Sequence, residues 1–144
     1  MKPFLDANIL VAILNRELPV FSDCARLLSL AEKPGLTLST SPLCLAIAWY
    51  FASKKCGDAR AAEKIRILAD KLEITAVDGE TTLAALADKR VGDLEDGLEY
   101  YAAVRAGCSH IISLDTNDFY FSRIPVCEPG AFLREFVGGK RSFH

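Results

Sequence analysis

The sequence of 144 residues has no apolar run long enough to cross a membrane. Its longest run, LCLAIAWYFA, covers 43–52, and a membrane helix needs roughly 20 apolar residues. Asp6 interrupts the N-terminal apolar run after three residues, so the run does not resemble a secretory signal. We therefore expect a soluble protein with no membrane partner.

Neither sign of charge is in large excess. The chain has 17 basic and 19 acidic residues, with a formal net charge of −2. Proteins that bind nucleic acid by bulk electrostatics usually carry a basic patch or a high isoelectric point. Any binding of nucleic acid must therefore be local and assisted by a metal ion.

Cysteines do not show the patterns of a disulfide framework or a zinc site. There are five of them, an odd number, and none are spaced as C-x-x-C. Unpaired thiols inside a protein core are typical of a reducing compartment. We expect reduced cysteines and a cytoplasmic protein.

Short apolar segments alternate with longer amphipathic ones along the chain. The short segments predict strands at 3–5, 36–40, 73–77, 109–114 and 124–126. The longer segments predict helices at 7–15, 20–33, 43–55, 59–72, 80–90, 93–107 and 130–137. This alternation predicts one α/β domain over 1–137, with a central, mainly parallel sheet of four to five strands covered by helices on both faces. The tail 138–144 is expected to be mobile.

Four aspartates stand where apolar runs give way to a turn or a helix start. Asp6 follows the first strand, Asp96 lies in a helix start, and Asp115 and Asp118 follow the strand at 109–114. In parallel sheets the ligand crevice lies beyond the carboxyl ends of the strands. Converging carboxylates are typical ligands of Mg²⁺, which prefers oxygen.

Each acid also has a purely structural explanation. Asp6 is a suitable N-cap for the helix at 7–15, and Asp93 with Asp96 resembles a capping box. Asp115 and Asp118 could simply close a turn. Capping and turn formation do not explain why all four acids fall on the edge of the sheet that binds ligands. We therefore predict a shared acidic site.

Three segments resemble the PIN-domain family, the fold of many VapC-type toxin ribonucleases. They are FLDANIL, GDLEDGLEYYAAVRAGCSHIISLDTNDF and IPVCEPGAFLREF, and together they span nearly the whole chain. The resemblance implies a three-layer α/β/α, Rossmann-like fold. It also implies an endoribonuclease that depends on Mg²⁺ or Mn²⁺, cuts RNA, acts as a homodimer and is paired with a VapB-like antitoxin.

The resemblance also assigns roles to individual residues. It makes Asp6 and Asp96 metal ligands, Asp118 a metal ligand or a carboxylate that orients water, and Asp115 an outer member of the catalytic set. It makes Asn8, Ser113 and Asp93 the residues that position ligands, water or phosphate. Ser113 stands where the family usually has Thr, and the hydroxyl is retained.

One acid of the family pattern is absent. Family members usually carry a Glu in the helix that follows the second strand, and Ile47 stands at the matching position, or Ala46 or Ala48 if the register shifts. The alternative hypothesis is therefore a catalytically weakened PIN-fold module that binds RNA or protein. An aspartyl-phosphate enzyme or receiver domain is a weaker alternative. Such sites need either a second acid two residues after the first or a lysine at a late strand end, and Asn8 and the segment SLDTND supply neither.

Overall fold

Apolar triplets form the two central strands of the sheet. The computed structural model describes residues 1–141, with side chains as far as Phe136. In it, β1 is Pro3–Leu5 and β4 is His110–Ile112. Their apolar side chains are almost all fully buried, with Phe4 and Ile111 both at 0% exposure. Strands that are buried on both faces are typical of a parallel sheet covered by helices.

Three further two-residue strands complete the sheet, namely β2 Ser39–Thr40, β3 Glu73–Ile74 and β5 Val126–Cys127. The strand order is β3-β2-β1-β4-β5, and every pairing is parallel. The chain runs outward from β1 to β3 and then returns to place β4 on the other side of β1. The switch point in strand order therefore lies between β1 and β4, where such sheets bind ligands.

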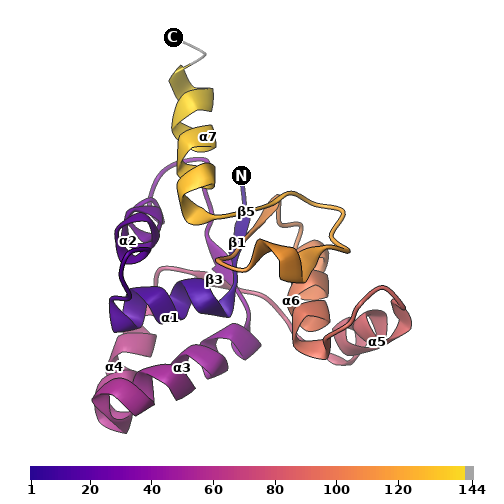
Figure 1. Cartoon of the computed structure of the whole chain (residues 1–144), viewed down its shortest axis with the longest axis horizontal. Coiled ribbons are helices and arrows are strands. Elements are labelled where there is room, and N and C mark those ends of the chain that lie inside the picture. The colour runs from indigo at the N-terminus through magenta and orange to yellow at the C-terminus, as the bar shows by residue number, and fades with distance from the viewer. Residues whose placement is uncertain (142–144) are drawn as a thin grey trace.

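Helices cover both faces of the sheet, which confirms the predicted three-layer α/β/α fold. In Figure 1, α1 lies beside α3, α2 beside α7, and α5 beside α6. The helices in the described part of the chain are α1 Ala7–Asn15, α2 Phe21–Ser29, α3 Pro42–Cys56, α4 Asp58–Ala69, α5 Gly79–Ala87, α6 Leu94–Arg105 and α7 Pro129–Arg141, with a 3-10 helix, η1, at Thr116–Phe119.

Local sequence signals explain where α3 and α6 begin and how α6 packs. The Ser41 hydroxyl accepts a hydrogen bond from the Cys44 amide at 3.2 Å, and Pro42 follows in the first turn of α3. Asp93 caps α6. At Gly97 an added Cβ would lie 2.7 Å from a Val91 methyl group, so glycine allows α6 to approach its neighbours closely. These contacts fix the acidic N-terminal turn of α6 in place.

The element boundaries differ from those predicted. The segments 36–40 and 73–77 contribute only two paired residues each, because neighbouring strands overlap only there. Helix α7 continues to Arg141, beyond the predicted end at 137. Residues 142–144 lie outside the described part of the chain, so the mobile tail and the 1–137 domain boundary stay predictions.

Two further expectations bear on the class of protein. All five cysteines are free thiols, as predicted, and Cys24, Cys44 and Cys108 are buried. Within the described helices, none combines the length and the apolar composition that crossing a membrane requires.

Candidate active site

Asp6 lies at the carboxyl end of β1, where the chain turns into α1. It occupies the N-cap position of α1, but its side chain makes no capping hydrogen bond. The residue is 6% exposed, and its Oδ2 accepts a hydrogen bond from the Ser113 hydroxyl at 2.6 Å. The structural explanation of Asp6 as a capping side chain is therefore not supported.

Ser113 and Asn8 form a small polar network with Asp115. The Asn8 side-chain amide donates to Ser113 Oγ at 3.2 Å and to Asp115 Oδ2 at 3.4 Å. The Asp115 amide donates to Ser113 Oγ at 3.0 Å, and the Leu114 amide donates to Asn8 Oδ1 at 3.2 Å. The network joins the start of α1 to the chain after β4, so it fixes the spacing of Asp6 and Asp115.

The acids of α6 divide into a capping residue and residues that face the site. Asp93 accepts hydrogen bonds from the amides of Glu95 at 2.8 Å and Asp96 at 3.3 Å, which confirms its predicted capping role. Asp96 is partly buried, whereas Asp93 is exposed. Asp93 therefore contributes by holding the first turn of α6, from which Asp96 projects.

A cavity of about 300 Å³ opens at the switch point between β1 and β4. Asp6, Asn8, Asp96, Asp115 and Asp118 all line it, so four of the predicted acids meet in one place. Its other lining residues are Ala7, Val11, Glu17, Ile47, Phe51 and Glu95. Ser113 and Asp93 support the lining residues without lining the cavity themselves.

Ile47 occupies the cavity wall. Its position there, beside Asp6 and Asp96, shows that a longer acidic side chain at 47 would face the same space. The α3 wall is apolar, since Phe51 is the other residue that α3 contributes. The Glu that the family pattern places at position 47 would therefore have lined this cavity, and Ile47 removes one carboxylate from it.

Crowded carboxylates shift the proton affinities at this site. Burial, followed by repulsion from Asp93, Asp118 and Asp6, raises the pKa of Asp96 to about 7. Burial and the charge of Asp115 raise the pKa of Asp118, and burial and Asp93 raise that of Glu95. Such a site favours either protons or a cation, because like charges at short range disfavour full ionisation.

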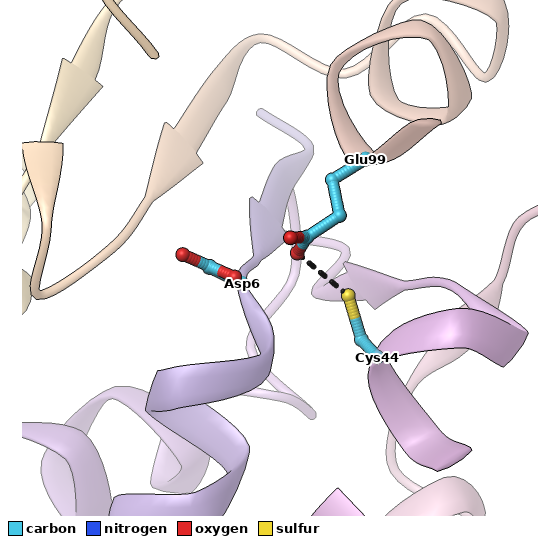
Figure 2. Close-up of side chains that lie close together, drawn as sticks. All are labelled: Asp6, Cys44 and Glu99. Atoms are coloured by element: carbon cyan, nitrogen blue, oxygen red, sulfur yellow. Dashed lines mark hydrogen bonds between the residues drawn. The ribbon is translucent and has the colours of Figure 1, made fainter. Parts of the chain in front are cut away.

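Glu99 and Cys44 lie beside Asp6, and neither was predicted from the sequence to belong to the site (Figure 2). Glu99 is 1% exposed and Cys44 is fully buried. The Cys44 thiol donates to Glu99 Oε1 at 2.8 Å, and the Ala7 amide donates to the same oxygen at 3.4 Å. Burial, followed by contact with Asp6, raises the pKa of Glu99 to about 10.

A sequence signal for Glu99 did exist. It follows Asp96 by three residues, so both lie on the same face of α6. Among the described residues, Asp6, Cys44 and Glu99 form the group whose possible ligand atoms all lie within 4.8 Å of one another. Asp6, Asp96 and Asp118 surround the cavity at wider spacing, so their role as a ligand set stays a prediction.

A larger cavity of about 540 Å³ lies between α5, α6 and the segment before β5. Its only carboxylate among the described residues is Asp88, which is paired with Arg90 at 2.8 Å and accepts a hydrogen bond from the Tyr101 hydroxyl at 2.7 Å. These bonds hold the pKa of Asp88 well below its usual range. Because the charge of Asp88 is already balanced by Arg90, this larger cavity offers no free carboxylate for a cation. The acidic cavity between β1 and β4 is therefore the better candidate for the active site.

Comparison with known proteins agrees with this geometry. A family model described as PIN domain matches residues 2–117. The chain belongs to the PIN domain family. No curated protein sequence matches the chain at a significant level. PIN domains are generally nucleases that use a divalent metal ion, and the donor set of the cavity, carboxylates with raised pKa values, fits such an ion.

Solved PIN-domain toxins have the same fold at low sequence identity. VapBC2 from Rickettsia felis, bound to a DNA fragment from its promoter, matches at a TM-score of 0.67 and 20% identity, covering 89% of this chain and 98% of that one. VapBC-1 from nontypeable Haemophilus influenzae matches at 0.67 and 14% identity, over 90% and 99%. VapC20 from Mycobacterium tuberculosis, a sarcin-ricin loop cleaving toxin, matches at 0.60 and 20% identity, over 76% and 86%.

Proposed function

We propose that this PIN domain is an endoribonuclease that depends on Mg²⁺ or Mn²⁺ and hydrolyses RNA phosphodiester bonds. The observation that carries the proposal is the meeting of Asp6, Asp96, Asp115 and Asp118 in one cavity at the switch point of the sheet. These residues come from the ends of β1 and β4 and from the start of α6. Their convergence supports one shared function better than four separate local roles.

Asp6, Asp96 and Asp118 would hold the ion, and Asp115 would act as an outer carboxylate. When bound, the ion supplies a water of lowered pKa and neutralises negative charge on the scissile phosphate. The Ser113 hydroxyl orients Asp6 through its 2.6 Å hydrogen bond. Asn8 orients Asp115, and Asp93 fixes the turn that carries Asp96. No side chain needs to act as a nucleophile.

The biological setting that we propose is a VapBC-type toxin-antitoxin pair in the cytoplasm. Support comes from the solved relatives, two of which are structures of VapBC. Helix α3 exposes Trp49, Tyr50 and Phe51, and Phe51 also lines the acidic cavity. A VapB-like antitoxin that covers these exposed side chains would reach the active site through Phe51. We further propose that the toxin is a homodimer.

A second candidate function is an RNA- or protein-binding module that has lost turnover. The observation that favours it is Ile47, an apolar residue in the cavity wall where the family usually carries an acid. An ion held by fewer carboxylates would bind more weakly.

Cleavage of RNA by the purified protein separates the two functions. The nuclease proposal expects cleavage in Mg²⁺ or Mn²⁺, its loss with a chelator, and its loss in Asp96→Asn. Asp70→Asn is the matched control, because it makes the same change at an exposed site on the end of α4, which contributes nothing to the cavity. RNA binding without cleavage, unchanged in Asp96→Asn, would favour the binding module.

A further inference from the structure

Three ligand atoms lie close together beneath the acidic cavity, on the side of Asp6 that faces the protein interior. Asp6 comes from the junction of β1 and α1, Cys44 from the first turn of α3, and Glu99 from α6 (Figure 2). Their exposures are 6%, 0% and 1%, and the possible ligand atoms are all within 4.8 Å of one another. A thiol and two carboxylates are thus gathered in a buried position.

Glu99 has one oxygen that the protein does not satisfy. Its Oε1 accepts from the Cys44 thiol and the Ala7 amide, whereas Oε2 is buried without a hydrogen-bond partner. A buried polar atom without a hydrogen-bond partner destabilises the fold, and more so if it is charged. Burial and contact with Asp6 raise the pKa of Glu99, so in the metal-free protein a proton lies between the two carboxyl groups. A cation that displaces this proton would bind both carboxylates.

The surroundings contain groups that favour negative ligands. Ala7 is the first residue of α1 and Cys44 is the third residue of α3, so the positive ends of two helix dipoles are directed at the cluster. The Ser41 hydroxyl also donates to Cys44 Sγ at 3.3 Å. Burial and Glu99 act in the opposite direction and raise the pKa of the Cys44 thiol well above its usual value. Coordination overcomes this effect, because a metal-bound thiol is deprotonated outright.

We propose that Asp6, Cys44 and Glu99 form an inner binding site for a thiophilic divalent ion such as Zn²⁺ or Co²⁺. Mg²⁺ is a poor fit, because it takes oxygen ligands, whereas Zn²⁺ accepts cysteine and carboxylate together at about 2.0–2.3 Å. The inner site shares Asp6 with the proposed catalytic site, but its existence does not depend on RNA cleavage.

Cobalt provides the test, since Co²⁺ bound to thiolate has a charge-transfer absorption in the near ultraviolet that Co²⁺ bound only to oxygen lacks. The full chain is freed of metal and titrated with Co²⁺ in excess Mg²⁺, which occupies the outer carboxylates. We expect the sulfur band to saturate at one equivalent of Co²⁺ and to be absent in Cys44→Ser. Cys127→Ser is the matched control and should keep the band, since Cys127 lies on the edge strand β5.

Glu99→Gln provides a variant that keeps the packing. Gln has the same shape and can still accept from Ala7 and Cys44. We expect it to weaken Co²⁺ binding by more than about tenfold, at least as much as losing a residue that only hydrogen-bonds to a metal ligand. In the same excess of Mg²⁺, Zn²⁺ should raise the melting temperature of wild type and Cys127→Ser but not of Cys44→Ser, and the melting curves also report whether each variant folds.

The results separate this proposal from the proposed nuclease activity. Asp96→Asn should keep the sulfur band while losing RNA cleavage. Co²⁺ binding without a sulfur band in wild type, or a band that persists in Cys44→Ser, would overturn the inner site and leave the nuclease proposal intact.

Discussion

Replacing Glu99 by Gln should stabilise the metal-free protein, and more so at higher pH. Glu99 is 1% exposed, and the pKa of its carboxyl is raised from 4.5 to about 10. Between these values the folded protein keeps a proton that the unfolded chain has released. The stability contributed by the neutral carboxyl is therefore fully present below the unfolded pKa and is lost as pH rises towards the folded pKa.

The size of the effect follows from the linkage relation. One bound proton corresponds to about 1.4 kcal/mol of unfolding free energy per pH unit. Gln does not titrate, and its side-chain amide can donate to Asp6 as the protonated carboxyl of Glu99 does. We therefore expect the free energy of unfolding of Glu99→Gln to exceed that of wild type, with a difference that grows by about 1 kcal/mol per pH unit from pH 5 to pH 8.

Urea unfolding at several pH values, with a chelator present, measures this difference. Glu63→Gln makes the same substitution at an exposed site on α4 and serves as the control. A difference between Glu99→Gln and wild type that stays constant with pH would refute the reasoning. So would a Glu99→Gln variant that is less stable than wild type at pH 8, because the buried carboxyl would then not be the destabilising group.

Three further predictions concern the cavity and its supports. Asp96 must lose its proton to bind an ion, and its pKa is raised to about 7. Titrations at limiting Mn²⁺ should therefore show the Mn²⁺ affinity falling by up to about tenfold per pH unit below pH 7. An Mn²⁺ affinity that stays constant from pH 5.5 to 8 would contradict this. Ile47→Glu adds a carboxylate to the cavity wall, so Mn²⁺ affinity and RNA cleavage should both rise. Ile47→Gln is the uncharged control, and equal effects of Ile47→Glu and Ile47→Gln would show that the added charge is not the cause. Asp93→Ala removes the α6 cap and should lower the unfolding free energy by about 1 kcal/mol, while Asp93→Asn should lose much less.

The fold could be predicted because local and global signals agree. Ser41 with Pro42 predicted the start of α3, Asp93 predicted the start of α6, and alternating elements predicted a parallel sheet. The strand ends could not be predicted, because pairing depends on how far neighbouring strands overlap. At β3, on the edge of the sheet, only Glu73 and Ile74 pair.

The outer part of the site could be predicted, and the inner part could not. Asp6, Asp96, Asp115 and Asp118 stand at the ends of elements, where sheet topology alone brings them together. Glu99 lies within α6, and although its spacing from Asp96 places both residues on one face of the helix, that spacing does not show that Glu99 is fully buried beside Asp6. Cys44 was expected to be an ordinary core thiol, because its contact with Glu99 joins residues that are 55 positions apart.

The central claim is that acids from β1, α6 and the segment after β4 together hold a divalent cation. A crystal structure of the protein soaked in Mn²⁺, with anomalous scattering recorded for that ion, tests it most directly. We predict a peak in the cavity within bonding distance of carboxylate oxygens of Asp6, Asp96 and Asp118. Two results together would contradict the account: no anomalous peak among these three residues in crystals at saturating Mn²⁺, and RNA cleavage by the same protein in solution with Mn²⁺.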